Sequence, residues 1–253
     1  MASVRLLLTI PLHLTLLALV FVGIVDFIKF HQDNNLNGGY HIGVLIYLTF
    51  WGQLIWFVFL VAATIVDALD VIGYSSTNPT KYYYFLKTRD VLYRSYAGPV
   101  GIAITLLFWS VIAVDEQGIF PKHIADIYPS QMNHIQHTLP FFAALLELML
   151  VNHQFHKFKV PVITGIPSTA QFKEDITHTF SLLNAFLYPF LISRYVQGHF
   201  AYPFLDWMPG YAQAIFIILS IAFAGAIYLA LRKLSRWRWG GEPGSMALKT
   251  KDQ

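Results

Sequence analysis

Long runs of apolar residues recur along this chain, and they limit its possible folds more than any other feature. A helix that crosses the hydrocarbon core of a bilayer needs roughly 20 predominantly apolar residues. Six segments approach or meet this requirement: residues 6–25, 43–66, 96–114, 138–151, 176–193 and 212–231. Because 56% of the 253 residues are hydrophobic and only 12% are charged, the composition is too apolar for an ordinary soluble domain. We therefore expect an all-α, polytopic membrane protein, a bundle of about six transmembrane helices.

The first apolar run follows Arg5 and superficially resembles a secretory signal peptide. A signal peptide has an apolar core of about 7–15 residues, so the run at 6–25 is too long, and we expect it to remain as the first spanning helix. All 253 residues then form one domain that ends in a basic tail at 232–253. A polar connection is expected at 67–94, where Ser-Ser-Thr-Asn-Pro at 75–79 breaks any helix.

Lysine and arginine are distributed unequally between the two sets of connecting segments. The segments expected on one side of the membrane hold fourteen of the 17 lysine and arginine residues. The segments expected on the other side hold only Lys29, Lys122 and Arg194. Because cytoplasmic segments carry the excess of positive charge, both termini are expected in the cytosol. The run from Lys233 to Trp239 is then a basic and aromatic anchor at the membrane interface.

The composition excludes several kinds of chemistry. Cysteine is absent, which excludes disulfides, thiolate nucleophiles and cysteine-ligated zinc. The chain has no Gly-rich nucleotide loop, no Gly-x-Ser-x-Gly motif and no His-Glu-x-x-His motif. The net charge of +3 is too small to indicate a nucleic-acid-binding surface. Any nucleophile must therefore carry an oxygen.

One polar stretch, residues 131–140, stands at the entrance to the fourth apolar segment. It contains His134 and His137, with Asn133 one helical turn before His137, so that Asn133 could orient the ring. Pro140 disfavours a helix that continues through this stretch, and it predicts a helix start near Thr138 or a kink there.

Other polar groups are expected at the same depth in the bilayer. Thr49 lies about 9 Å inside the second span at 1.5 Å per residue, and Asp26 lies where the first span leaves the membrane on the same side. If spans one, two and four are neighbours, these groups and the histidines form one cluster. A threonine in a spanning helix commonly bonds back to the carbonyl four residues earlier, and Gln53 is suited to bind a neighbouring helix. The functional alternative makes Thr49 a nucleophile and His137 its base.

Glu147 is the costliest residue of the chain in a bilayer, because it places an ionisable group within a span. It lies about 15 Å along the helix axis from His137, too far for a direct bond. It is either a neutral, hydrogen-bonded structural acid or a polar contact for substrate. Asp26 is the better candidate for a carboxylate near the histidines.

A second pair, His153 and His156, raises the alternative of a metal site shared with His134 and His137. The two pairs are separated by on the order of 24 Å of helix, whereas metal–ligand bonds are near 2 Å. They cannot hold one ion, so we expect neither a metal nor a cofactor.

The chain resembles the androgen-induced protein family over residues 48–225, through a series of short motifs in a fixed order. These are Leu48-Thr-Phe50, Gly98-Pro-Val-Gly101, Phe108-Trp109, Phe120-Pro-Lys122, Asn133-His-x-x-His137, Leu139-Pro-Phe141, Glu147, His153-Gln154-Phe155 and Tyr202-Pro-Phe-Leu205. The resemblance implies a six-helix membrane protein that hydrolyses fatty acid esters of hydroxy fatty acids. The nucleophilic threonine of the family matches Thr49, and its catalytic histidine matches His137.

The resemblance implies acyl transfer without a metal or cofactor, on a branched fatty acid ester drawn from the lipid bilayer. Thr49 attacks the ester, His137 takes its proton, and water releases the acyl-enzyme. His134, Asn133, Asp26 and Glu147 are the supporting candidates, and Asn133, His134 and the backbone near Pro140 could stabilise the oxyanion. The protein is expected in the endoplasmic reticulum or plasma membrane, with its site toward the non-cytosolic leaflet.

A second function class remains open. In a transporter or lipid-binding protein, Asp26, Glu147 and the histidines would form a polar path through the membrane.

Overall fold

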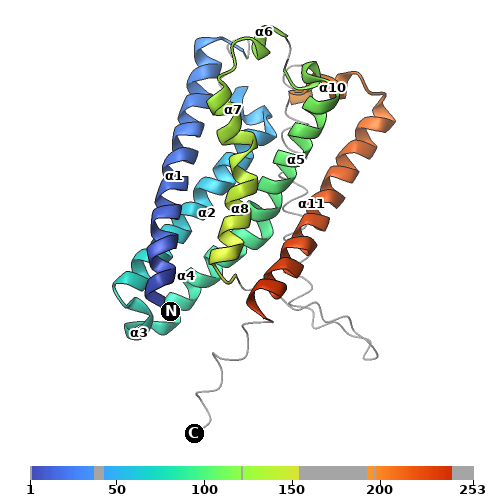
Figure 1. Ribbon diagram of the computed structural model, residues 1–253. Coiled ribbons are helices and arrows are strands. Elements are labelled where there is room, and N and C mark those ends of the chain that lie inside the picture. Colours follow the sequence, from blue (N-terminus) through green and yellow to red (C-terminus); the bar gives the residue numbers. More distant parts are fainter. Residues whose placement is uncertain (1, 37–42, 121, 154–192, 196–197, 241–253) are drawn as a thin grey trace, which may run out of the picture.

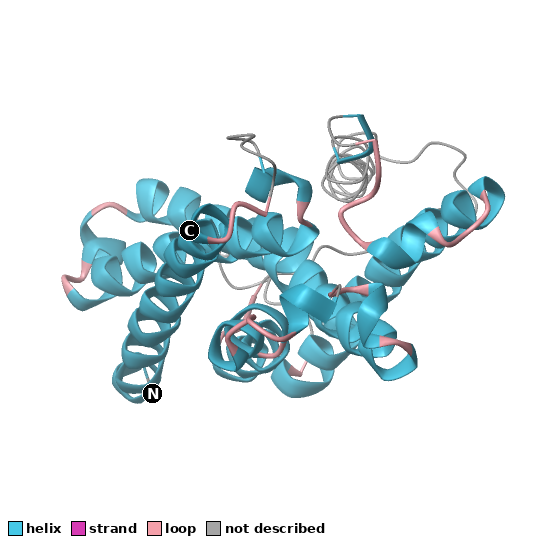
Figure 2. Cartoon of the chain, turned by 90° about the horizontal axis from the view of Figure 1, so that it is seen from above, coloured by secondary structure: helices cyan, strands magenta, loops and turns pink. Residues whose placement is uncertain are grey.

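A computed structural model describes residues 2–36, 43–120, 122–153, 193–195 and 198–240. All regular structure in these ranges is helical (Figures 1 and 2). The longer helices are α1 (Ala2–Asp33), α2 (Leu48–Val71), α4 (Pro79–Leu92), α5 (Gly98–Val114), α7 (Ser130–His137), α8 (Leu139–Leu150) and α11 (Gly210–Trp239). Short turns of helix lie between them: Gly43–Ile46, α3 (Tyr74–Thr77), Tyr93–Ala97, Glu116–Gly118, α6 (Lys122–Ala125) and α10 (Pro203–Asp206).

Four helical segments are long and apolar enough to cross a membrane: Arg5–Asp33, Leu48–Val71, Pro79–Val114 and Gly210–Trp239. They correspond to the first, second, third and sixth expected spans. The fourth expected span, 138–151, is α8, which has only 12 residues. The fifth, 176–193, lies almost wholly outside the described residues.

The helices run side by side, with α1, α8 and α11 in front of α2 and α5 in Figure 1. The end that carries α6, α7 and α10 lies opposite the end that carries the N-terminus and α3. Helix α1 packs against α2, α7 and α8, and α2 also contacts α7. The assumption that spans one, two and four are neighbours is therefore confirmed.

The expected polar connection at 67–94 is helical for most of its length. The chain does break at Asn78, whose backbone is not helical, but a new helix begins at Pro79. Proline is well suited to the first turn of a helix because its missing N–H has no partner there. Helix α4 then continues through a wide turn at Tyr93–Ala97 into α5. The charges that suggested a loop are accommodated by pairing, as Arg89 and Asp90 are buried together.

The core is filled by large side chains from α2 and from the turn Tyr93–Ala97, and by small ones from α8. Trp56, Phe59 and Tyr93 are almost fully buried against Ala143 and Ala144. Gly101 permits the close approach of α5 to α2 and α8. A Cβ atom at this position would collide with the Trp56 indole and lie 3.1 Å from Pro140 Cβ. This packing brings α8 and the adjoining α7 against α2 and α5.

Large apolar side chains also cover the outside of the bundle. A soluble monomer rarely exposes contiguous apolar surface of this extent, whereas the hydrocarbon core of a bilayer solvates it. Examples are Leu7, Phe21, Val58, Ile65, Phe142, Ile218 and Leu229.

Candidate active site

Thr49 lies in the first turn of α2 and not about 9 Å inside a helix, as the sequence suggested. The residues before it form a separate short turn, Gly43–Ile46, and Tyr47 has an extended backbone. Helix α2 therefore begins only at Leu48. The threonine does not bond back along its own helix, because its hydroxyl oxygen lies 3.0 Å from Nε2 of His137.

His137 ends α7 at a break in the helical path. Thr138 has a φ of −119°, and α8 restarts at Leu139 with Pro140 in its first turn. The break at Thr138 that Pro140 predicted is confirmed. It lets the imidazole point across to α2.

The hydrogen bonds of His137 determine which ring nitrogen carries the proton. Its Nδ1 lies 2.7 Å from Asn133 Oδ1 and 3.2 Å from the Asn133 backbone oxygen. A carbonyl oxygen only accepts, so Nδ1 donates, and in the neutral ring Nε2 is then an acceptor. The Thr49 hydroxyl therefore donates to Nε2, which is the arrangement that activates an oxygen nucleophile.

The imidazole is held rigidly and away from water. It stacks on Phe108 with ring centroids 3.6 Å apart and planes 7° apart. The Trp109 indole N–H donates to the His137 carbonyl and to the Thr138 hydroxyl. Burial lowers the pKa of His137 from 6.5 to about 3, and the charge of the nearby His134 adds to this effect. The ring is thus neutral at pH 7 and able to take a proton.

A cavity of about 420 Å³ opens beside Thr49 and His137. This volume lies in the usual range for small-molecule sites. Its walls are largely aromatic: Phe27, Phe30, Tyr47, Phe120, Tyr128 and Tyr202. A smaller apolar cavity of about 50 Å³ also reaches Thr49, from the side of Phe108 and Phe204.

Of the supporting residues near the histidines that the sequence suggested, one contacts His137 and the others lie outside the cavity. Asn133 joins the site as the partner of His137, whereas His134 is exposed, bonds Thr138 through Nδ1 at 3.0 Å and stacks on Trp109. Asp26 is exposed on α1 and does not line the cavity. Gln53 bonds the Ile135 carbonyl, so its expected role between helices is confirmed.

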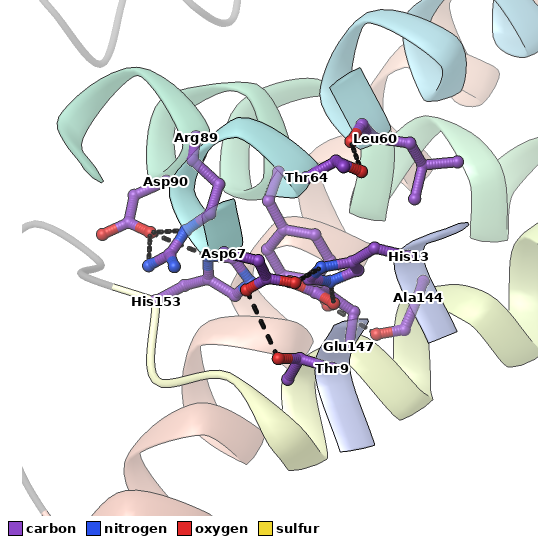
Figure 3. Close-up of polar contacts among 11 residues, drawn as sticks. Thr9, His13, Leu60, Thr64, Asp67, Arg89, Asp90, Ala144, Glu147 and His153 are labelled. Carbon is purple, nitrogen blue, oxygen red and sulfur yellow. Dashed lines mark hydrogen bonds and ion pairs between the residues drawn. The ribbon is translucent and has the colours of Figure 1, made fainter. Parts of the chain in front are cut away.

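Glu147 belongs to a second, separate polar cluster near the opposite end of the bundle (Figures 1 and 3). Its two oxygens lie 2.8 Å from His13 Nε2 and 2.9 Å from His153 Nε2. The other ring nitrogens bind Asp67 at 2.7 Å and Asp90 at 2.9 Å. Of the two alternatives for Glu147, a neutral, hydrogen-bonded structural acid or a polar contact for substrate, these hydrogen bonds agree with a structural acid, and its neutrality stays a prediction.

Counting protons shows that this cluster holds more protons than two neutral imidazoles supply. Four contacts join an imidazole nitrogen to a carboxylate oxygen. Each needs one proton, and two neutral imidazoles supply only two, so the cluster holds two more. Arg89 also donates to Asp90 at 2.7 Å. The helices α1, α2, α4 and α8 are thereby linked by a chain of hydrogen bonds between imidazoles and carboxyl groups.

Sequence reasoning missed His13 and Tyr202. His13 stands in the middle of an apolar run, and an ionisable group there requires a partner, which was the available signal. Tyr202 appeared only as part of a motif. The loop that carries it packs against the first turn of α2, where the Leu48 N–H donates to the Tyr202 hydroxyl at 3.1 Å.

The fold and site define a helical membrane protein in which a hydroxyl, an imidazole and an amide form a chain beside an aromatic cavity. The chain belongs to the FAR-17a/AIG1-like protein family, whose model matches residues 10–236. The expected family is therefore confirmed.

Individual relatives agree with this assignment. The chain is 28% identical to the androgen-dependent TFPI-regulating protein of Mus musculus, over 77% of this chain and 76% of that protein. It is 27% identical to the androgen-induced gene 1 protein of Homo sapiens, over 76% of each. No solved structure matches significantly.

Proposed function

We propose that this protein is an intramembrane lipid ester hydrolase that cleaves fatty acid esters of hydroxy fatty acids. The observation that carries the proposal is the chain from Thr49 through His137 to Asn133, with bonds of 3.0 and 2.7 Å beside the cavity. A threonine, an oriented imidazole and a buried cavity are the parts that nucleophilic acyl transfer requires. The activity agrees with the one that the family resemblance implies.

The reaction proceeds in two acyl transfers. The Thr49 oxygen attacks the ester carbonyl carbon while its proton passes to His137 Nε2. The tetrahedral intermediate collapses, and His137 returns the proton to the departing hydroxyl of the hydroxy fatty acid. Water then attacks the acyl-threonine by the same route and releases the fatty acid, so no metal or cofactor enters the chemistry.

The shape of the site suits a branched ester. Thr49 lies between the 420 Å³ aromatic cavity and the smaller apolar one. A secondary ester has two alkyl arms that leave the carbonyl region in different directions, and the two cavities offer an apolar environment for each. Burial of alkyl chains contributes about 0.8 kcal/mol per methylene, which favours long substrates over short ones.

The test is hydrolysis of a branched fatty ester of a hydroxy fatty acid by purified protein in detergent. Thr49→Ala and His137→Ala are expected to lower kcat on the order of 10³-fold or more. Thr64→Ala is the matched control, because Thr64 lies on the same helix and its hydroxyl only bonds back to the Leu60 carbonyl at 2.8 Å. Full activity in either site variant contradicts the proposal, as does proton-coupled lipid flux without hydrolysis.

The membrane orientation is a separate proposal. Both termini are cytosolic, and the site faces the non-cytosolic leaflet of the endoplasmic reticulum or plasma membrane, as the distribution of lysine and arginine favours. A glycosylation acceptor placed beside Gln117, near α6 and α7, is expected to be modified in cells. An acceptor near Ser75 is expected to stay unmodified, and the reverse result contradicts this orientation.

A further inference from the structure

The chemistry proposed above needs a donor for the oxyanion, and the two side chains that the sequence suggested, alongside the backbone near Pro140, are engaged elsewhere. Asn133 is occupied by His137, and His134 bonds Thr138. Neither residue lines the cavity beside Thr49. Negative charge on the carbonyl oxygen nevertheless requires a preorganised hydrogen-bond donor.

Tyr202 is placed to be this donor. Its hydroxyl oxygen accepts a hydrogen bond from the backbone N–H of Leu48 at 3.1 Å. Thr49 follows Leu48 in the same turn, and Thr49 and Tyr202 line the same two cavities. The tyrosine thus caps the first turn of α2 and lies directly beside the proposed nucleophile.

The direction of these bonds follows from proton counting. The Thr49 hydroxyl donates its single proton to His137 Nε2, as the tautomer of His137 requires. In a hydrogen bond between the Thr49 and Tyr202 hydroxyls, Tyr202 is therefore the donor. The Leu48 N–H that donates to the Tyr202 oxygen polarises the phenol, which makes the phenol a stronger donor.

The position of the hydroxyl also agrees with the cavities. Thr49, Ile119 and Tyr202 are the residues that line both the larger and the smaller cavity. A carbonyl attacked by Thr49 lies between these spaces, and its oxygen lies within about 3 Å of the attacking atom. A donor at the first turn of α2, in the wall of the same two cavities as Thr49, therefore lies close to that oxygen.

We propose that the Tyr202 hydroxyl is a catalytic oxyanion-stabilising group, a role that rests on the proposed hydrolase function. As Thr49 Oγ bonds to the carbonyl carbon, its proton moves to His137 Nε2 and the carbonyl electron pair moves onto oxygen. Tyr202 donates its O–H to that oxygen and keeps its proton throughout. When the carbonyl reforms, the protonated His137 gives its proton to the departing alcohol oxygen, and acyl-Thr49 remains.

Tyr202→Phe removes only the hydroxyl and tests this role in the full-length protein. Loss of one oxyanion donor typically lowers kcat about 10²–10³-fold, and KM is expected to change little. Tyr93→Phe is the matched control, because it removes a buried hydroxyl that bonds the Ala144 carbonyl at 2.6 Å, remote from Thr49. It is expected to lower the melting temperature but to leave kcat unchanged.

A transition-state mimic separates catalysis from packing. A long-chain alkyl trifluoromethyl ketone forms a tetrahedral oxyanion with an oxygen nucleophile. Its inhibition constant is expected to rise in Tyr202→Phe by the same factor as kcat/KM falls. If Tyr202→Phe does not fold, 3-fluorotyrosine at position 202 keeps the hydroxyl and makes it a stronger donor, so the ketone is expected to bind more tightly.

The outcomes separate the two proposals. Wild-type cleavage that Thr49→Ala abolishes, together with wild-type kcat and ketone affinity in Tyr202→Phe, overturns the role of Tyr202 and leaves the hydrolase function intact. Unchanged ketone affinity in the 3-fluorotyrosine protein also overturns the role of Tyr202 and leaves the hydrolase function intact. A wild-type protein that cleaves no ester overturns both proposals.

Discussion

At the scale of single residues, the burial of His137 determines how the reaction depends on pH. The pKa of this ring is lowered from 6.5 to about 3 because burial disfavours the charged form. The neutral base therefore persists as the pH falls through 6.5, where an ordinary histidine is half protonated. We predict that kcat/KM for an uncharged ester shows no loss with a midpoint near 6.5.

The control for this pH profile is Asn133→Asp, which places a carboxylate beside Nδ1, 2.7 Å away in the native chain. A negative charge there stabilises the imidazolium and raises the pKa of His137, so the acid limb is expected to move to higher pH. A wild-type midpoint at 6.5 or above, or an unmoved profile in Asn133→Asp, contradicts the assignment of His137 as the buried base.

The proximity of Thr49 and His137 was predicted from the sequence, because both lie near the same end of neighbouring segments, although Thr49 lies in the first turn of α2 and not about 9 Å inside it. The partner of His137 was predictable in part, since Asn133 is one turn away on α7. Asp26 was not excluded by this reasoning. Depth in a bilayer places a residue along a helix but does not tell which way its side chain points, and Asp26 faces outward.

At the scale of helices, the close packing of α5 on α2 and α8 depends on the absence of a side chain at Gly101. A Cβ atom at this position would collide with the Trp56 indole, which is 2% exposed and has no room to move. Overpacking of this kind costs about 1–3 kcal/mol. We predict that Gly101→Ala lowers the melting temperature of the purified protein in detergent.

Gly225 in α11 provides the comparison, since a Cβ atom there meets nothing within 4 Å. Alanine in an open helical position is more stable than glycine by about 0.5–1 kcal/mol, so Gly225→Ala is expected to melt at or above the wild-type temperature. Equal melting temperatures for the two variants would contradict the close-packing account.

Helix boundaries were predictable from the sequence where a single residue, such as a proline, breaks the helix. Pro140 correctly indicated the break at Thr138, and the break near Asn78 was also expected. The continuous helix from α4 into α5 was not expected. Its charged residues resemble those of a loop when their partners are unknown. Asp90 binds the neighbouring Arg89 and also His153, which lies 63 residues later, a contact that only the tertiary structure reveals.

At the scale of the whole molecule, the Glu147 cluster links four helices across the end of the bundle opposite the active site. Removing one partner of a buried charge network leaves the others uncompensated and costs about 3–5 kcal/mol. We predict that Glu147→Gln lowers the melting temperature strongly, because His13 and His153 each lose their carboxylate acceptor. The folded fraction is expected to keep the wild-type KM.

Glu116→Gln controls for the loss of a glutamate charge, since Glu116 is exposed. It is expected to melt like the wild type. A Glu147→Gln protein that is as stable as Glu116→Gln, but does not cleave the ester, would mean that Glu147 acts in the reaction and does not primarily hold the bundle together.

The overall class was predictable because apolar runs of about 20 residues permit few structures in a lipid environment. Four of the six expected spans correspond to helices long enough to cross a membrane. The second polar cluster was not predictable, because its members come from positions as far apart as His13 and Glu147. The sequence identifies residues that need partners but does not identify the partners.

The central claim is that Thr49 is the nucleophile, and trapping the acyl-enzyme tests it most directly. Purified protein is mixed with a branched fatty ester, quenched in acid within milliseconds to seconds and digested, and the peptide containing Thr49 is examined by mass spectrometry. We predict the mass of one fatty acyl group on Thr49, decaying as the free fatty acid appears, and no such adduct in His137→Ala. Ester cleavage at the full rate with no acyl group on Thr49, and persisting in Thr49→Ala, would contradict the claim.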